Sequence, residues 1–445
     1  MAENPFDHNA PVGEEGVFAG RQEVFSFVQA NLVGGHQRHA LVILGAPQMG
    51  KSSVLRRLPA VLDPRYIPVR LALRAGTVAS EKAWLTALAE TLPQALSMLN
   101  MQSARIPELP AHPAELREML IGEVFSQGLN AMRRDRHLLM LVDNAERLLT
   151  AVQNHTLPRD TFHFLAELLE KHRHFDVLMA FDSHYEPELL AAGPPFDPGL
   201  FHRLGPLSPE ETSALITGRL PEGLAIEPAA LDTIYDLTAG HPYLTQLVGW
   251  LLFERSAGRG HNGPITAGDA LAVADSAVAM GSDTLSAVWS QGTRQEQLVL
   301  TALTALNPQE PPTPVPHEDI GAWLIAADLP LDPRTVNAAW RRLEYEGVLR
   351  LTGDGQLTIA GGLQRRWLRS HVTLPAGRIS ASWRRVILLV AATVALLALL
   401  LAILSANPGG GPEATTGASD ATITLMFDLQ ATADAYNATQ TATAP

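Results

Sequence analysis

Residues 41–55, LVILGAPQMGKSSVL, constrain the fold more than any other part of the chain. Residues 45–52 fit the pattern G-x-x-x-x-G-K-[ST], in which backbone N–H groups of a loop and of the helix after it surround phosphate oxygens. The apolar run before this loop predicts a strand, and SSVLRRL after it predicts a helix. The sequence therefore predicts a strand–loop–helix unit that binds a nucleoside triphosphate, which we expect to be ATP.

Individual side chains of this loop have expected tasks. Lys51 is expected to reach the β- and γ-phosphates, and Ser52 to bind Mg²⁺. A second acidic metal partner is expected at the end of another buried strand, where Asp143 follows the run 138–142 and would hold Mg²⁺ through water. The loop residues expected to bind the cofactor are Gly45, Ala46, Pro47, Gln48, Met49, Gly50, Lys51, Ser52 and Ser53.

The position after Asp143 bears on hydrolysis. Many ATPases of this kind place Glu there to polarise the attacking water, and this chain has Asn144. An amide orients a water molecule but does not accept its proton, so we expect slow hydrolysis or binding without turnover. Glu146 would substitute if the chain turns it inward. The expected catalytic residues are Lys51, Asp143, Asn144 and Glu146.

The surrounding sequence alternates as in an α/β domain. After an irregular lead-in over residues 1–17, apolar runs alternate with helical periodicity through residues 18–205. Parallel strands need crossover connections, so the alternation predicts an α/β P-loop NTPase with a three-layer, parallel sheet. The expected strands are 40–44, 67–73, 138–142 and 177–181, and the expected helices include 84–92 and 162–169.

Two further sets of polar residues need interpretation. Asp182 and Ser183 follow the run 177–181, and they either contact the γ-phosphate or its attacking water, or simply end a strand. Four histidines in two pairs suggest metal ligands, but the chain has no cysteine and no matching carboxylate pattern. We therefore expect these histidines at the surface: His36, His39, His172 and His174.

From residue 206 the sequence predicts helices only. Ser208, with Glu211 three residues later, forms a capping box that starts the first of them, and we expect an all-α lid over residues 206–290. Residues 291–371 give three amphipathic helices and then two short apolar runs around the turn GDG, which predict a hairpin. Three helices and a hairpin are typical of a winged-helix domain.

The uncharged run 386–406 predicts one transmembrane helix, because its 21 residues span about 30 Å as a helix. A basic linker, residues 372–385, precedes it, and no Lys or Arg follows it in the Thr- and Ala-rich tail, residues 407–445. The positive-inside rule then places the N-terminal domains in the cytoplasm and the tail outside. We expect a single-pass protein of the inner (cytoplasmic) membrane.

Several separated motifs resemble one family. NPFDHNAPVGEEGVFAGRQEV, which contains Phe18, Gly20 and Arg21, resembles the segment before the phosphate loop in origin-recognition-type AAA+ and STAND-type signalling ATPases. FHRLGPLSPEE is similar to their link from sheet to lid, and LTAGHPYLTQLV, with Pro242, to their G-x-P motif. LTIAGGLQRRWLRS resembles the end of the winged helix in bacterial members, so the resemblance covers residues 4–370.

This resemblance implies a nucleotide switch rather than a metabolic enzyme. In such proteins sheet domain, lid and winged helix close around the nucleotide, and exchange or hydrolysis opens them toward a homo-oligomer. It also implies that Phe18, Gly20, Arg21 and Pro242 bind the nucleotide, with the proline near the adenine. Pro47-Gln48, where relatives often carry Arg-Arg, and Asn144 depart from the family pattern.

Three function classes follow. The first is a membrane-anchored signalling switch with an unidentified protein partner. The second is a membrane-bound winged-helix transcription regulator, although a net charge of −13 argues against a nucleic-acid partner. In that class the third helix of the winged unit would present to a DNA groove Arg334, Asn337, Arg341 and Arg342. The third class is a defence effector that acts through its membrane segment.

Overall fold

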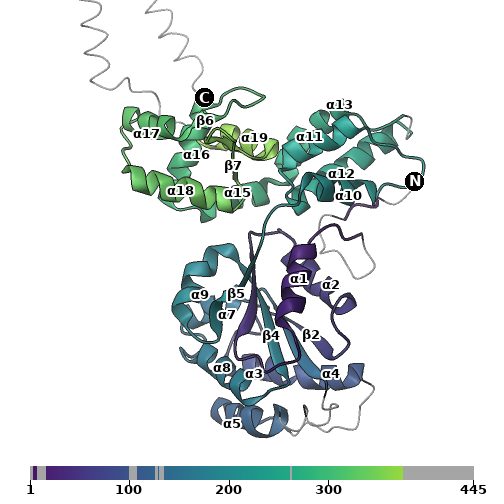
Figure 1. The fold of residues 1–445 in the computed structure, drawn as a ribbon, viewed down its shortest axis with the longest axis vertical. Helices are drawn as coiled ribbons and strands as arrows, with labels where there is room; N and C mark the ends of the chain where they lie inside the picture. The colour runs from purple at the N-terminus through teal and green to yellow at the C-terminus, as the bar shows by residue number, and fades with distance from the viewer. Residues whose placement is uncertain are drawn as a thin grey trace, which may run out of the picture. The chain divides into compact units, whose positions relative to one another are not determined.

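The computed structural model describes residues 4–7, 17–99, 108–125, 129, 135–260 and 263–373. The first part of the chain forms a five-stranded parallel sheet in the order β2-β3-β4-β1-β5 (Figure 1). The strands are β1 (Ala40–Gly45), β2 (Tyr66–Ala72), β3 (His137–Asp143), β4 (Phe175–Asp182) and β5 (Phe196–Leu204). The predicted parallel α/β sheet is therefore confirmed.

Alternate side chains of these strands enter two separate cores, because successive residues of a strand point to opposite faces. Leu41 and Ile43 of β1 pack with the first pair of helices, whereas Val42 and Leu44 pack with the helices of the other face. The first face is covered by α1 (Gln22–Asn31) and α2 (Lys51–Arg57). The second is covered by α3 (Glu81–Ala89), α4 (Thr91–Met98), α5 (Pro113–Met119), α7 (Glu146–Gln153), α8 (Thr161–Lys171) and α9 (Glu186–Ala192).

The strand order brings three loops together. β4 lies between β1 and β3, and Gly45 at the end of β1 pairs with Asp182 at the end of β4. Since parallel strands end at the same edge, the loops after β1, β3 and β4 meet there. These loops contain the phosphate-loop pattern, the acidic residue Asp143 and Asp182.

After β5 the chain is helical up to residue 291. Ser208 caps α10 through both bonds of the predicted box: Glu211 N donates to Ser208 Oγ at 3.1 Å, and Ser208 N donates to Glu211 Oε2 at 2.8 Å. The helices are α10 (Pro209–Thr217), α11 (Pro228–Thr238), α12 (Pro242–Gly258), α13 (Ala267–Ala272), α14 (Ala274–Met280) and α15 (Ser282–Gln291).

The next segment contains the three helices and the hairpin that the sequence predicts. β7 pairs antiparallel with β8, and a third short strand, β6, pairs with the other edge of β8. The elements are α16 (Arg294–Leu306), β6 (Val315–Pro316), α17 (His317–Ala326), α18 (Pro333–Tyr345), β7 (Leu349–Leu351), β8 (Gln356–Ile359) and α19 (Gly362–His371).

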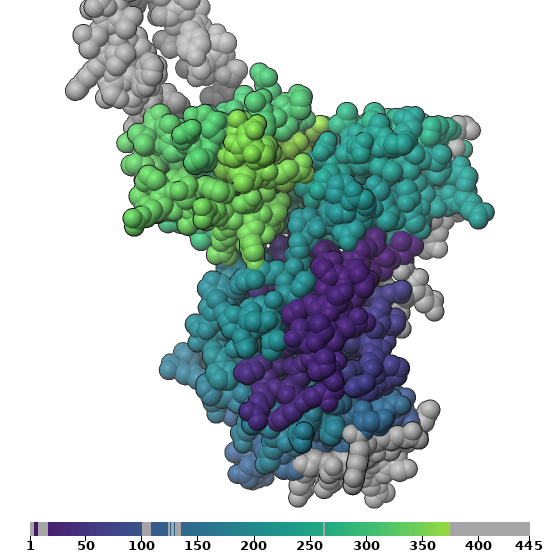
Figure 2. Space-filling model, viewed as in Figure 1, coloured from purple at the N-terminus to yellow at the C-terminus, as the bar shows by residue number. Residues whose placement is uncertain are grey.

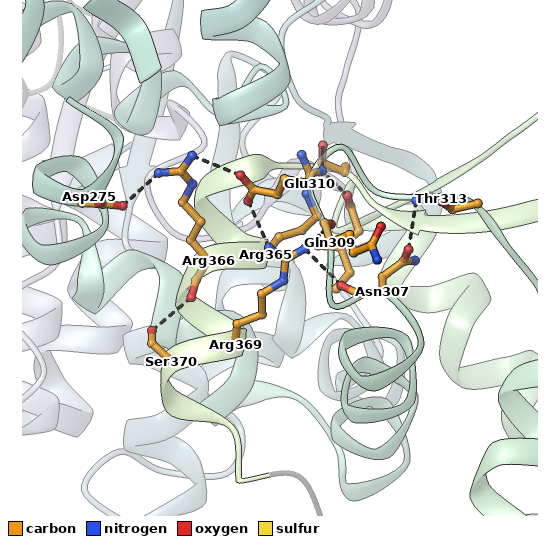
Figure 3. Close-up of polar contacts among 11 residues, drawn as sticks. Asp275, Asn307, Gln309, Glu310, Thr313, Arg365, Arg366, Arg369 and Ser370 are labelled. Carbon is orange, nitrogen blue, oxygen red and sulfur yellow. Dashed lines mark hydrogen bonds and ion pairs between the residues drawn. The ribbon is translucent and has the colours of Figure 1, made fainter. Parts of the chain in front are cut away.

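Helix α19 is tied to its neighbours by two arginines (Figure 3). Arg366 binds Asp275 of α14 at 2.9 Å and Glu310 at 3.1 Å. Arg369 binds the same Glu310 at 3.2 Å and donates to the Asn307 carbonyl oxygen at 3.0 Å. One carboxylate between two guanidinium groups thus fixes the helix to the loop after α16.

Within the described residues, no helix is both long and apolar enough to cross a bilayer. The predicted transmembrane run 386–406 and the tail 407–445 lie outside those residues, as does all of the basic linker 372–385 except its first two positions.

Two expectations need correction. The expected strands do not include β5, because Pro198, Gly199 and exposed positions interrupt its apolar pattern. The surface assignment is wrong for His172, which is 6% exposed and whose Nε2 lies 3.0 Å from the Ile121 carbonyl oxygen. His36 and His174 are half-buried, and only His39 of the four is exposed.

Candidate nucleotide-binding site

The loop after β1 has a backbone suited to phosphates. Gln48 and Gly50 have positive φ angles of 58° and 95°, and Met49 N donates to the Ala46 carbonyl oxygen at 3.2 Å. Helix α2 begins directly at Lys51. The N-terminus of this helix therefore adjoins the loop, an arrangement that favours a bound anion.

Lys51 lies over this loop. Its ammonium donates to the carbonyl oxygens of Gly45 at 2.6 Å and Ala46 at 2.9 Å. Burial lowers the pKa of Lys51, and the nearby carboxylates of Asp182, Glu146 and Asp143 oppose that effect. A cation beside the N-terminus of a helix favours a ligand that carries several negative charges.

Ser52 and Asp143 are brought together from different elements. Asp143 ends β3 and is 5% exposed, and its Oδ1 accepts from Ser52 Oγ at 3.0 Å. The same oxygen accepts from the Asn144 backbone at 3.1 Å. A hydroxyl and a carboxylate side by side are hard oxygen donors of the kind that Mg²⁺ prefers, so these two residues fit the predicted metal.

Asn144 and Glu146 follow on a sharp turn. Asn144 has a φ of 57°, and Ala145 N then donates to the Ala180 carbonyl oxygen of β4 at 2.9 Å. The turn carries the Glu146 carboxylate toward the sheet edge, where Oε2 accepts from Asp182 N at 3.3 Å. Burial raises the pKa of Glu146, against the effect of nearby Lys51. Glu146 therefore faces inward, as its expected role of substitute base requires.

These residues line a cavity of about 420 Å³, within the size range of small-molecule sites. Predicted residues that line it are Phe18, Arg21, Pro47, Gln48, Met49, Gly50, Lys51, Ser52, Ser53, Asn144, Glu146 and Pro242. Its other lining residues are Val17, Ala19, Asp182, Leu207, Leu215, Tyr243 and Gln246. Of the remaining predicted residues, Asp143 contacts the lining through Ser52, and Ala46 lines a smaller cavity of about 90 Å³. Gly45 is the last residue of β1, and its carbonyl oxygen accepts from Lys51 Nζ.

Gly20 does not line the cavity, whereas Arg21 lines it and also bonds to backbone carbonyl groups of the chain. A Cβ at Gly20 would overlap the Glu211 carboxylate, which accepts from Arg21 N at 3.1 Å. The Arg21 guanidinium donates to the Gly205 carbonyl oxygen at 2.6 Å and to that of Met49 at 2.9 Å. Arg21 therefore joins the phosphate loop to the start of the helical segment.

Two contacts to the phosphate loop were not predicted. Thr284 of α15 donates to the Gln48 side chain, and His241, the N-cap of α12, bonds to the Pro47 backbone. Burial lowers the pKa of His241 to about 4, and the cations of Arg21 and Lys51 add to the effect. The signal for His241 is its place directly before Pro242 in the motif that resembles G-x-P, whereas an isolated Thr in a helix gives none.

Comparisons with known proteins agree with this geometry. The family model nSTAND1, described as Novel STAND NTPase 1, matches residues 10–310. The Walker-type ATPase PABY2304 of Pyrococcus abyssi superposes with a TM-score of 0.56 at 13% identity, over 82% of this chain and 99% of that chain. The Aeropyrum pernix ORC2 protein, in ADPNP and ADP complexes, has a TM-score of 0.50 at 12% identity, over 82% and 98%. No curated protein sequence matches.

At these identities the two solved structures are similar to this chain in fold alone. The family match covers more than half of the chain and includes the phosphate loop, Asp143 and Glu146. The chain belongs to the Novel STAND NTPase 1 family of P-loop NTPases.

Proposed function

We propose that the chain is an ATP-dependent signalling switch that hydrolyses ATP slowly. The observation that carries this proposal is a set of hydrogen bonds from the phosphate loop through α15 to α19. Gln48 accepts from Thr284, and the carbonyl oxygen of the next residue, Leu285, accepts from Gln364 of α19 at 3.1 Å. At the start of α15, Ser282 Oγ accepts from Trp367 Nε1 of α19 at 3.1 Å.

These bonds support a route by which the nucleotide would act on α19. ATP and ADP shift an equilibrium only if they bind its two arrangements with different affinity. The backbone of Gln48 belongs to the phosphate loop, and its side chain contacts α15. A change of the loop at the γ-phosphate would therefore alter the packing of α15. Helix α15 in turn holds α19, the last described helix of the chain.

The residues at the cavity support hydrolysis, and the amide of Asn144 in place of a carboxylate supports a slow rate. Lys51 would bind phosphate oxygens, and the Asn144 amide would orient the attacking water. Glu146 would accept the proton of that water, and its raised pKa makes it a better base than an exposed carboxylate. Mg²⁺ held by Ser52 and Asp143 would neutralise phosphate charge when bound.

We assign roles to the remaining parts of the chain from the order of their helices and strands. We assign α10–α15 to the lid, residues 206–290, and α16–α19 with the small sheet to the winged helix, residues 291–371. The run 386–406 would anchor the switch in the inner (cytoplasmic) membrane, with residues 407–445 outside. Opening would expose surfaces for a homo-oligomer and for a protein partner.

The contacts of α18 favour packing over DNA recognition. Arg342 lies 3.4 Å from Glu296 and 3.3 Å from Glu346, so its charge is already paired. Asn337 accepts from Trp340 Nε1 at 2.9 Å. Of the four residues that a DNA groove would need, two are therefore engaged within the chain, which supports the switch over the transcription regulator.

Hydrogen exchange of α19 tests the proposal. Backbone protection of residues 362–371 is expected to differ between ATP·Mg²⁺ and ADP·Mg²⁺ in the parent. Lys51→Ala should lose ATP binding and with it the difference. Thr284→Val should still bind ATP but show a smaller difference, because it cannot donate to Gln48. Ser290→Ala, at an exposed position of the same helix, is the matched control. Equal α19 protection in both nucleotides would contradict the switch.

A further inference from the structure

Two short N-terminal stretches, residues 4–7 and 17–19, contact the helical segment; we call them together the N-terminal strap. Residues 4–7 lie on α12, Val17 lies beside Arg219 just after α10, and Phe18 packs against Phe25 of α1. Phe6 is 2% exposed and belongs to the core of the helical segment rather than to that of the sheet. It fits against Gly249 of α12, where an added Cβ would lie 2.6 Å from its ring. Figure 2 shows purple N-terminal residues next to the teal surface of the helical segment.

Polar contacts fix the same end of the strap. Asn4 Nδ2 donates to the Trp250 carbonyl oxygen at 3.2 Å and to Glu254 Oε1 at 2.8 Å, both in α12. Asn4 Oδ1 accepts from Phe6 N at 3.0 Å, so the residue also shapes the turn that presents the ring. Phe6 is therefore an anchored side chain and not a loose terminus.

Arg219, just after α10, joins the two stretches of the strap. Its guanidinium donates to the Pro5 carbonyl oxygen at 3.1 Å and to that of Val17 at 3.5 Å. Val17 is held close beside it, because a Cβ at Gly218 would lie 2.9 Å from Val17 Cγ1. A single half-buried arginine thus sets the position of residue 17 relative to residue 5.

The other side of the strap belongs to the nucleotide cavity. Its apolar lining includes Val17, Phe18 and Ala19, whereas the phosphate loop supplies polar lining. The helical segment adds apolar lining next to them, from Leu207, Leu215, Pro242 and Tyr243. Because Lys51 and Ser52 take the phosphate end, this apolar wall is left for the nucleoside end.

We infer that Phe6 and Arg219 are positioning residues for the nucleoside half of the ligand. This inference rests on the proposed nucleotide binding. Neither side chain lines the cavity. Arg219 holds Val17, where the wall of residues 17–19 begins, and Phe6 anchors the stretch to which the same arginine is bonded, so both act on the end of the wall that α1 does not hold. A wall that is already ordered costs no conformational entropy on binding, so its anchors raise affinity for the nucleoside and leave the phosphates unaffected.

Competition binding tests the inference. A fluorescent ATP analogue with Mg²⁺ is displaced by ATP or by inorganic triphosphate from the full chain and its variants. In Phe6→Ala and Arg219→Ala the Kd of ATP is expected to rise about 10-fold, because the wall would then have to be ordered when ATP binds. The Kd of triphosphate should stay within about 2-fold of the parental value. Arg219→Lys should recover part of the loss.

Gly249→Ala supplies an independent variant. It places a methyl group 2.6 Å from the Phe6 ring and 3.1 Å from Ile216 Cδ1 of α10, while improving the helix propensity of α12. The ring is therefore displaced most, and chemical unfolding of the variant shows whether the helices keep their stability. Arg255→Ala is the matched control, because Arg255 lies on the same helix and pairs with Asp269 rather than with the strap.

The outcomes separate the two ideas. A folded Gly249→Ala or Arg219→Ala variant with parental ATP affinity overturns the inference, and so does an equal loss for ATP and triphosphate. A parent that ATP does not bind overturns the proposed function and the inference with it. Selective loss of ATP affinity, with Arg255→Ala unchanged, supports both.

Discussion

At the scale of single residues, the turn at Asn144 decides which carboxylate reaches the cavity. Its φ of 57° is a left-handed conformation that Asn adopts more readily than most residues. The turn allows Glu146 to bond to Asp182 N. The sequence predicts the phosphate loop and Asp143 from pattern alone, but the direction of Glu146 depends on this one dihedral angle, which no spacing rule specifies.

Replacing Glu146 tests its role as a base. In Glu146→Gln, kcat for ATP hydrolysis is expected to fall about 100-fold or more while ATP still binds, because an amide does not accept the proton. Since burial raises the pKa of Glu146, parental turnover should decline on acidification at a higher pH than an exposed glutamate would give. Phosphate release measured against pH checks both. Glu90→Gln, at an exposed position, is the control, and parental turnover in Glu146→Gln would contradict the assignment.

His241 makes stability depend on pH. Its folded pKa of about 4 lies below the ordinary 6.5, so between these values the unfolded chain binds a proton that the folded chain does not. The free energy of unfolding should therefore fall as the pH drops from 6.5 through 4, by about 3 kcal/mol in total. Urea unfolding at several pH values measures this loss. His241→Asn keeps an N-cap and should show a shallower dependence; an unchanged slope would refute the assignment.

At the scale of elements, burial explains which strands can be predicted from the sequence. Strands β1, β3 and β4 are covered on both faces and so read as continuous apolar runs, which are easily recognised. β5 is an edge strand, where Pro198 and exposed residues are tolerated, so its pattern is weak. Contacts between elements, such as Thr284 with Gln48, leave no periodic signal in the sequence at all.

Gly240 is in close backbone contact with Leu207, which lies in the linker before α10. It has a φ of 72°, its carbonyl oxygen accepts from Leu207 N at 2.9 Å, and a Cβ there would overlap the Leu207 carbonyl oxygen. Gly240→Ala should lower the free energy of unfolding by about 3 kcal/mol or more. Gly223→Ala has a similar φ of 90° but open space around it, and should cost about 1 kcal/mol. Chemical unfolding compares the two, and equal losses would contradict the steric account.

At the scale of the whole molecule, the five arginines of residues 366–385 divide into two groups. Arg366 and Arg369 form ion pairs with Glu310 within the described residues, so they stabilise the fold in addition to any effect on membrane orientation. Arg378, Arg384 and Arg385 lie beyond the described residues and next to the apolar run. The proposed membrane orientation therefore depends mainly on these three.

Charges placed in the apolar run test the anchor. Leu396→Arg combined with Leu397→Arg should move the full chain from the membrane fraction to the supernatant, because each arginine at the centre of a span costs about 2.5 to 3.5 kcal/mol. Fractionation after alkaline carbonate extraction measures the shift. Leu351→Arg, at an exposed position of β7, is the control, and a parent found in the supernatant would contradict the anchor.

The buried position of Phe6 has a practical consequence for labelling. A purification tag or fluorescent protein fused to the first residue would sit a few positions from a side chain that belongs to a core, and it would change the behaviour that the fusion is meant to report. Because the chain contains no cysteine, a single Asp7→Cys substitution would instead accept one dye at an exposed position directly after Phe6, at the cost of a carboxylate that attracts Arg219. Its emission would then follow the strap directly during a nucleotide cycle.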